Sequence, residues 1–167
     1  MFELEKTDEI RRLITITKSD SGVSGPLLAE AHIELGKAMG RQMTMFDPAD
    51  TTVVAMLRGG IFFAQGIYFS LDCRFQTYDP KHETFVRPET KNVILVDSVI
   101  NTGKTMLDIM EPSMYVACCV INEKAIPLFV DRLYTVRISK NSFVGSNVQK
   151  QSGNKGPDTT MRLFNMI

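Results

Sequence analysis

The fold is decided by the stretch Val93-Ile94-Leu95-Val96-Asp97-Ser98-Val99-Ile100-Asn101-Thr102-Gly103-Lys104-Thr105. Four apolar residues lead into one carboxylate, and a hydroxyl-rich loop that contains a glycine follows. An apolar run of this length is too short for a helix and rich in β-branched side chains, which is typical of a strand buried on both faces of a parallel sheet. The chemistry is therefore expected at the carboxyl end of this strand.

The loop after the strand predicts a phosphate-binding site. The backbone N–H groups of residues 101–105 and the hydroxyls of Thr102 and Thr105 can converge on one anion. A helix expected over residues 103–111 would add its positive N-terminal end. Asp97 can accept hydrogen bonds from sugar hydroxyls.

The same loop has two other possible interpretations. Gly103-Lys104-Thr105 is how a nucleotide triphosphatase P-loop ends, but such a loop needs a glycine at position 98, where this chain has Ser98. The plainer alternative is a core strand that ends in a capped turn, with Asp97 solvated and Thr102 as the N-cap.

An apolar strand, an acidic residue and a following Thr-Gly-x-Thr resemble the motif with which type I phosphoribosyltransferases bind phosphoribosyl pyrophosphate (PRPP), and the resemblance covers most of the chain. Thr52-Val53-Val54-Ala55-Met56-Leu57-Arg58-Gly59-Gly60 resembles the strand and short turn that hold pyrophosphate in that family. Glycine lets the backbone approach a ligand closely, and arginine offers planar donors to diphosphate oxygens. The resemblance implies that PRPP is bound by Arg58, Gly59, Gly60, Asp97, Ser98, Asn101, Thr102, Gly103, Lys104 and Thr105.

Within that family, the sequence is most similar to the uracil phosphoribosyltransferases. Ser98 stands where most type I enzymes carry a second carboxylate, and Leu57-Arg58-Gly59-Gly60 resembles the turn that the uracil enzymes favour. Gly156-Pro157-Asp158-Thr159-Thr160-Met161-Arg162-Leu163-Phe164 resembles their C-terminal segment. The resemblance implies that uracil is bound by Phe143, Val144, Gly145, Gly156 and Asp158.

The chain departs from the uracil enzymes in two segments. Residues 146–155 form a polar insertion where the family has a compact loop, and residues 78–91 are shorter than the family's hairpin near pyrophosphate. Arg74, Lys81 and Arg87 are candidates for the missing positive charge, against the alternative of a solvated surface role.

The activity that the resemblance implies is transfer of the 5-phosphoribosyl group from PRPP to uracil, giving UMP and pyrophosphate. Arg58, Asp97 and Asp158 would be the catalytic residues, and a magnesium ion (Mg2+) would be held mainly by PRPP and water rather than by protein ligands. The alternatives are a phosphoribosyltransferase for another base, or a protein of the same fold that senses PRPP or a nucleotide without turnover.

The amino-acid composition limits which classes of partner and which compartment we expect for this protein. Lys plus Arg equals Asp plus Glu, 19 against 19, so no overall field would attract nucleic acid or an anionic membrane. Residues 1–6 are charged and lack an apolar h-region, which gives cytoplasmic residence as the expectation. The three cysteines, Cys73, Cys118 and Cys119, match neither a disulfide framework nor a metal spacing and are expected as buried thiols.

The remaining pattern predicts an α/β fold: a doubly wound, mostly parallel sheet with helices on both faces, formed by residues 1–167 as one domain with 139–167 as its base-binding segment. We expect strands over 52–57, 73–78, 92–97, 114–121 and 133–138, and helices over 26–43, 61–71 and 103–111. Met39 and Met43 on the first of these helices suggest an apolar face for a homodimer.

Overall fold

The computed structural model, which describes residues 1–153 and 155–167, contains a six-stranded sheet in the order β1-β6-β5-β4-β2-β3. All of its neighbouring strands run parallel. The strands are β1 (Phe2–Glu3), β2 (Thr51–Met56), β3 (Arg74–Tyr78), β4 (Asn92–Ile100), β5 (Met114–Asn122) and β6 (Leu133–Ser139). Because parallel strands end at the same edge, the carboxyl ends of the central strands β2, β4, β5 and β6 define one rim of the molecule.

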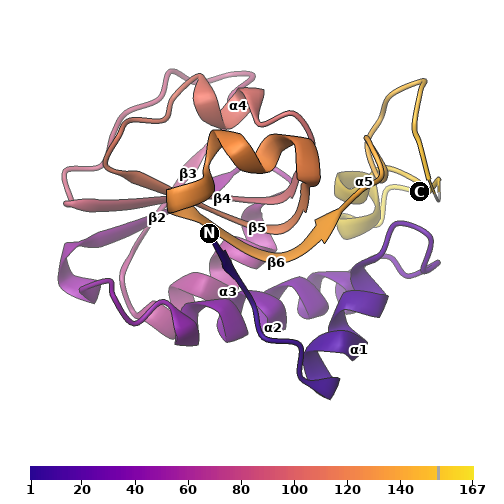
Figure 1. The fold of residues 1–167 in the computed structure, drawn as a ribbon, viewed down its shortest axis with the longest axis horizontal. Helices are drawn as coiled ribbons and strands as arrows, with labels where there is room; N and C mark the ends of the chain where they lie inside the picture. Colours follow the sequence, from indigo (N-terminus) through magenta and orange to yellow (C-terminus); the bar gives the residue numbers. More distant parts are fainter. Residues whose placement is uncertain (154) are drawn as a thin grey trace.

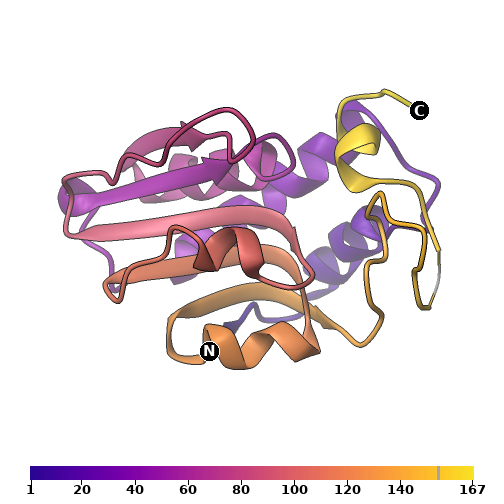
Figure 2. The same cartoon turned by 90° about the horizontal axis from the view of Figure 1, so that it is seen from above.

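Helices cover both faces of the sheet, as predicted for a doubly wound fold (Figure 1). One face carries α1 (Asp8–Thr17), α2 (Pro26–Gln42) and α3 (Ile61–Leu71). The other carries α4 (Lys104–Leu107) and the 3-10 segments η2 (Glu123–Leu128) and η3 (Val130–Arg132), while η1 (Pro48–Asp50) precedes β2. The last helix, α5 (Thr159–Leu163), stands beyond the carboxyl ends of the strands with the C-terminal segment (Figure 2).

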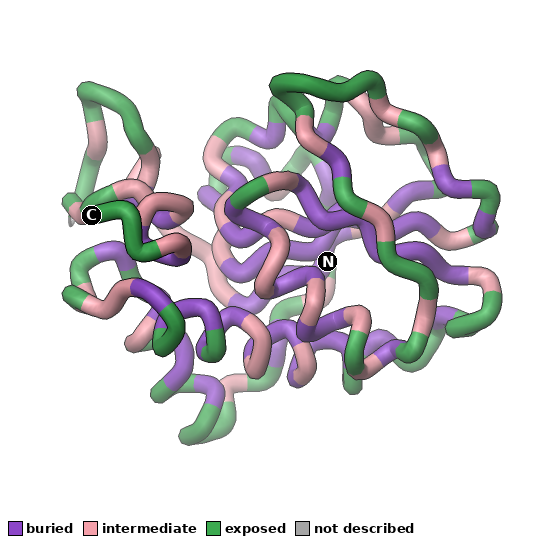
Figure 3. The backbone as a smooth tube through the Cα atoms, turned by 180° about the vertical axis from the view of Figure 1, so that it is seen from behind, coloured by how far each residue is buried: buried purple, intermediate pink, exposed green. Residues whose placement is uncertain are grey.

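Two buried clusters hold the layers together, one on each face of the sheet. Val53, Ile94 and Val96 face α2 and α3, whereas Val54 and Leu95 face the other side, as alternation along a strand requires. Figure 3 shows the buried residues concentrated in the strands and the helices packed beneath them, with exposed residues in the connecting loops.

Helices α2 and α3 pack at backbone distance because glycines face each other at their crossing. A Cβ atom added to Gly36 would lie 2.2 Å from the Phe63 carbonyl oxygen, and one added to Gly66 would lie 2.1 Å from the Ile33 carbonyl oxygen. No side chain fits between these helices, so both positions need glycine.

The structure corrects several predicted boundaries. The strand expected over 92–97 continues to Ile100, so Asp97 lies inside it rather than at its end. The helix expected over 103–111 covers only Lys104–Leu107, and helix α1 was not predicted at all. Met39 and Met43 are 0% exposed and belong to the core, so the argument that they form a dimer face is wrong. In the part of the chain that the structure describes, no helix has the length and apolarity needed to cross a membrane.

Candidate functional site

A cavity of about 580 Å3 lies at the carboxyl ends of β2 and β4 and brings three distant segments together. The turn after β2 supplies Arg58 and Gly59, β4 supplies Asp97 and Ser98, and the C-terminal segment supplies Asp158. The three residues predicted to share one crevice, Arg58, Asp97 and Asp158, therefore line the same cavity. We call this space the main cavity.

Glycines in the turn after β2 let it lie directly against β4. A Cβ atom on Gly60 would stand 2.4 Å from the Val96 carbonyl oxygen, and the Gly60 N–H donates to the Met56 carbonyl oxygen at 2.9 Å. That N–H is therefore not free for a ligand, and Gly60 serves the packing of the turn. A Cβ atom on Gly59 would lie 2.9 Å from Thr160 Oγ1, so Gly59 marks the point where the turn meets the C-terminal segment.

Arg58 connects the turn to the end of the chain. Its guanidinium carbon lies 5.2 Å from the centre of the Phe164 ring, and Nη1 donates to the Met166 sulfur at 3.6 Å. The Leu57–Arg58 peptide bond, which introduces this residue, is cis. Phe164 in turn packs on Phe62 of α3, with ring centroids 5.3 Å apart. These contacts hold a cation at the rim of the main cavity.

Asp97 is the carboxylate on the floor of the main cavity. Its Oδ1 accepts a hydrogen bond from the Ser98 backbone N–H at 2.7 Å. Burial raises the pKa of Asp97 to about 7, against the opposing effect of hydrogen bonds from the backbone of Ser98 and Val99. Asp97 therefore changes charge near neutral pH.

The predicted phosphate loop borders a smaller cavity of about 230 Å3. Gly103 adopts φ 75°, and a Cβ atom there would lie 2.8 Å from the Phe129 ring, so the loop needs glycine. The N–H groups of Thr102, Gly103 and Thr105 make no hydrogen bond to any described residue. The loop thus keeps several donors available, although α4 has only four residues.

The predicted uracil-binding residues are spread over several cavities. Gly145 and Asp158 line the main cavity, Phe143 lines the phosphate-loop cavity, and Gly156 lies against Ser19, far enough inside that a Cβ atom would meet the Ser19 carbonyl oxygen at 2.1 Å. The Asp158 carboxylate also caps α5, because its Oδ1 accepts from the Met161 N–H at 3.0 Å. Asn154 of the 146–155 insertion lies outside the described residues, while Ser146 and Asn147 line the main cavity.

The three candidate cations have different positions. Lys81 lines the main cavity, together with its neighbour His82. Arg74 begins β3 and therefore lies at the opposite edge of the sheet. Arg87 is bound to Glu111 at 3.0 Å and to the Pro88 carbonyl oxygen at 2.6 Å. Of the three, Lys81 is the one that reaches the cavity.

The regular pairing of β4, β5 and β6 is interrupted at one residue in each strand, and we call this interruption the strand break. It lies beside a second chamber that the sequence did not reveal. Asp97 pairs with Cys118 and Val99 with Val120, but Ser98 and Cys119 are skipped, as is Val136 in the next strand. Side-chain alternation shifts there, since Val96 and Ile100 would share a face in a regular strand yet belong to opposite clusters.

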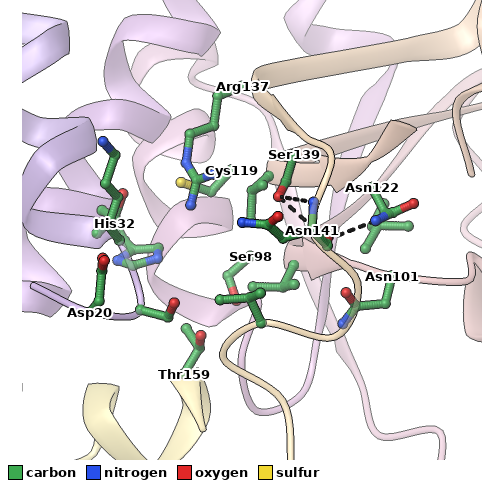
Figure 4. A pocket seen from close by; sticks show the side chains of 17 residues that line it. Asp20, His32, Ser98, Asn101, Cys119, Asn122, Arg137, Ser139, Asn141 and Thr159 are labelled. Atoms are coloured by element: carbon green, nitrogen blue, oxygen red, sulfur yellow. Dashed lines mark hydrogen bonds between the residues drawn. The ribbon is translucent and has the colours of Figure 1, made fainter. Parts of the chain in front are cut away.

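The second chamber, which we call the inner chamber, has a volume of about 230 Å3. Figure 4 shows its lining side chains, and some of the residues that line it also line the main cavity. The inner chamber is lined by polar side chains that include His32, Asn122, Arg137, Ser139 and Asn141. The His32 Nδ1 lies 2.9 Å from the Leu28 carbonyl oxygen, and burial lowers the pKa of His32 to about 4, so the ring is neutral at pH 7. The signal in the sequence is an arginine, Arg137, between Val136 and Ile138 in the strand expected over 133–138.

The comparisons with known proteins bear on the fold. The chain is similar to the AQ2163 protein from Aquifex aeolicus, with a TM-score of 0.61 at 15% identity over 83% of this chain and 86% of that one. It is also similar to an orotate phosphoribosyltransferase from Aeropyrum pernix (TM-score 0.51, 18% identity, 66% and 73% covered) and to a purine phosphoribosyltransferase from Pyrococcus horikoshii Ot3 (0.50, 20%, 65% and 82%). The fold is that of the type I phosphoribosyltransferases. No family model matches the sequence, and no curated protein matches it.

Proposed function

We propose that the protein transfers the 5-phosphoribosyl group of PRPP to a nucleobase and releases pyrophosphate. The observation that carries the proposal is the main cavity, in which the Arg58 turn, Asp97 and the Asp158 segment surround one volume of about 580 Å3. That size lies within the range of ~300–1,000 Å3 common for small-molecule sites. The free N–H donors of the 102–105 loop lie next to it and supply the partner for a phosphate.

Each segment takes one part of PRPP in this proposal. The 102–105 loop binds the 5-phosphate, the ionised Asp97 accepts hydrogen bonds from the ribose hydroxyls, and Arg58 with the Gly59 backbone binds the diphosphate. Positive charge develops at the ribose C1 as negative charge grows on the departing diphosphate. Arg58 therefore stabilises the transition state more than the bound substrate, an effect that for one donor reaches roughly 10²–10³ in rate.

Asp158 is proposed to act beside the reacting ribose. Its Oδ1 is held by the Met161 N–H, which fixes the direction of the carboxylate while leaving acceptor capacity on the other oxygen. Lys81 is proposed to assist Arg58 at the diphosphate, because it lines the same cavity. Ser98 and Asn101 complete the PRPP site, and Lys104 lies at its phosphate end.

A magnesium ion fits this site as part of the substrate complex. Among the described residues, no three His, Cys, Asp or Glu side chains form a cluster that could hold a metal. Magnesium usually keeps water and phosphate oxygens as most of its ligands, so an ion carried by the diphosphate needs no cage of side chains. When bound, it would neutralise charge on the diphosphate.

Uracil is the proposed acceptor, which makes UMP the product. The support is the C-terminal likeness to the uracil enzymes, together with the position of Gly145 and Asp158 on the main cavity. The spread of Phe143, Val144 and Gly156 over other cavities favours keeping a different base as the alternative.

The test is to incubate the protein with PRPP, magnesium and each free base in turn, and to measure pyrophosphate and nucleotide. We expect release with uracil that is lost in Arg58→Ala and kept in Arg74→Ala, since Arg74 lies at the far edge of the sheet. PRPP binding by calorimetry without release with any base would favour a sensing protein. Absence of PRPP binding would contradict the proposal altogether.

A further inference from the structure

Arg137 is a cation without a partner inside the inner chamber. It follows the strand break in β6, pairs with Val120, and extends between His32 and Asn141 (Figure 4). Its Nε atom is buried without a hydrogen bond, and among the described residues its guanidinium donates to no acceptor and pairs with no carboxylate. A guanidinium carries hydrogen-bond donors only, so the partner that Arg137 lacks is an acceptor such as an oxygen atom.

None of the neighbouring oxygens in the chamber is bonded to Arg137 Nε. The Asn141 carbonyl oxygen already accepts from Asn122 Nδ2 at 2.8 Å and from Ser139 Oγ at 3.4 Å. Arg137 is half-buried, but its Nε–H has lost water and gained no partner, which is unfavourable, and natural structures rarely keep such a group without a ligand or a function.

The inner chamber borders the main cavity closely enough for one bound molecule to contact both. The residues that line both spaces are Ser98, Val99, Asn101 and Thr159. A group seated in the inner chamber would therefore lie next to the ribose that Asp97 is proposed to hold. Its volume of about 230 Å3 is sufficient for a nucleobase.

We propose that Arg137 determines the specificity for the acceptor, which is a base presenting oxo or carboxylate oxygens to the inner chamber. This inference rests on the proposed function and names the substrate class of the same site. If the base carried an amino group at that edge, its N–H donors would lie opposite the N–H donors of Arg137. Neither group would then have a hydrogen-bond acceptor. Sites built to pair with a substrate oxygen discriminate strongly for this reason.

The test compares wild type with Arg137→Gln and Arg137→Met, and uses Arg74→Gln as the matched control because that arginine is exposed at the other edge of the sheet. The bases are uracil with oxo groups, orotic acid with an added carboxylate, and cytosine with an amino group. We expect wild type to prefer uracil or orotic acid to cytosine. Both Arg137 variants should raise KM for the preferred base by roughly 10- to 100-fold with kcat changed far less, since the lost contact is to the base and not to the departing diphosphate.

Comparing the rise in KM for uracil and for orotic acid in the Arg137 variants shows which oxygen Arg137 contacts. A larger loss for orotic acid assigns the carboxylate to Arg137, whereas an equal loss for uracil assigns the ring oxygen. Neither substitution breaks an ion pair among the described residues, so the melting temperature of the ligand-free variants should stay close to wild type, and a loss of binding would not reflect unfolding.

Unchanged selectivity and KM in both Arg137 variants would overturn the inference while the proposed function stands. If wild type releases no pyrophosphate with any base, the proposed function fails, and calorimetry of each base with wild type and Arg137→Gln decides the inference separately. Equal affinity in both proteins, or no binding of any oxygen-bearing base, would overturn it. A loss confined to the Arg137 variants and absent in Arg74→Gln would support it.

Discussion

Arg58 is the residue at which the turn after β2 meets the end of the chain, through Phe164 and Met166. We predict that Arg58→Ala lowers kcat by roughly 10²–10³ but changes base affinity only a few-fold, because its partner charge grows during the reaction. The exposed side chain makes few packing contacts, so the melting temperature should stay close to wild type. Steady-state kinetics with Arg74→Ala as the control would check this, and an unchanged kcat would give Arg58 a structural role only.

Asp97 gives the protein a pH dependence with a definite sign. Its pKa of about 7 in the folded state lies above the unfolded value of ~3.9, so the folded state holds a proton that the unfolded chain has released. Asp97 therefore lowers the free energy of unfolding as the pH rises. Its protonated form contributes fully to stability below about pH 4, and this contribution is lost as the pH rises through about 7. The charged groups on the same cavity are Arg58, Asp79, Lys81, His82 and Asp158.

We therefore predict that Asp97→Asn, which cannot ionise, melts roughly 8–16 °C above wild type at about pH 8 and at the same temperature as wild type near pH 4. The His32 ring, with its pKa lowered to about 4, destabilises both proteins alike in acid, so it cancels in the difference. Melting curves across this pH range test the prediction. A constant difference at every pH would show that Asp97 does not titrate as proposed.

Individual residues of the candidate site could be predicted from the sequence where a polar side chain lies at or just after the end of an apolar run. Arg58 and Asp97 could be predicted because an apolar run ends at each of them or close by. Arg137 could not, because its position depends on the break at Ser98, Cys119 and Val136, and a skipped pair leaves no mark in the hydrophobic pattern. The register of neighbouring strands comes from tertiary packing rather than from any one segment.

Among the elements, the turn between β2 and α3 has a strict steric requirement for glycine at position 60. We predict that Gly60→Ala lowers the melting temperature by more than about 5 °C, because its Cβ atom would meet the Val96 and Met56 carbonyl oxygens, which are backbone and cannot move aside. Gly59→Ala is the matched control. Its Cβ atom would meet the side-chain hydroxyls of Thr160 and Ser98, which can rotate. It should fold normally and weaken PRPP binding, and equal melting temperatures for the two variants would contradict this account.

The elements also show where patterns fail. Helix 61–71 has the predicted bounds, because an apolar helix between a glycine turn and an αL residue, Asp72, is delimited locally. Helix α1 was missed although Thr7 caps it and Ile10, Leu13 and Ile14 follow helical spacing. The helix expected over 103–111 ends at Leu107, before Pro112, since the chain must return to start β5 at Met114.

For the whole molecule, the homodimer stays a prediction whose interface must lie elsewhere than the buried Met39 and Met43. Exposed apolar side chains occur instead on α3 and the edge strand β3, where Phe69 is 53% exposed and Phe75 is 36% exposed. We expect a dimer with an interface above roughly 1,000 Å2. Light scattering at micromolar concentration would test it, and a mass near the 18.8 kDa monomer would count against it.

The C-terminal segment is tied over the rim of the sheet by Arg162, which is 1% exposed. Its Nε donates to the Val23 carbonyl oxygen at 3.0 Å and its Nη2 to Ser21 Oγ at 3.0 Å, while the Gly25 N–H donates back to the Arg162 carbonyl oxygen at 2.7 Å. These bonds join the α1–α2 loop to the segment that carries Asp158. Arg162 therefore helps to hold Asp158 at the main cavity.

We predict that Arg162→Met loosens this segment without opening the sheet. Hydrogen exchange should quicken in residues 19–25 and 156–164 and stay slow in β4 and β5, because the bonds lost lie only at the rim. Turnover should fall with the loss of Asp158 placement, while phosphate binding at the 102–105 loop persists. Arg132→Met is the control, since Arg132 also donates to backbone oxygens, those of Glu111 and Met114, but at the other end of the sheet. If both variants altered exchange and turnover alike, Arg162 would be a general stabilising residue rather than the anchor of the site.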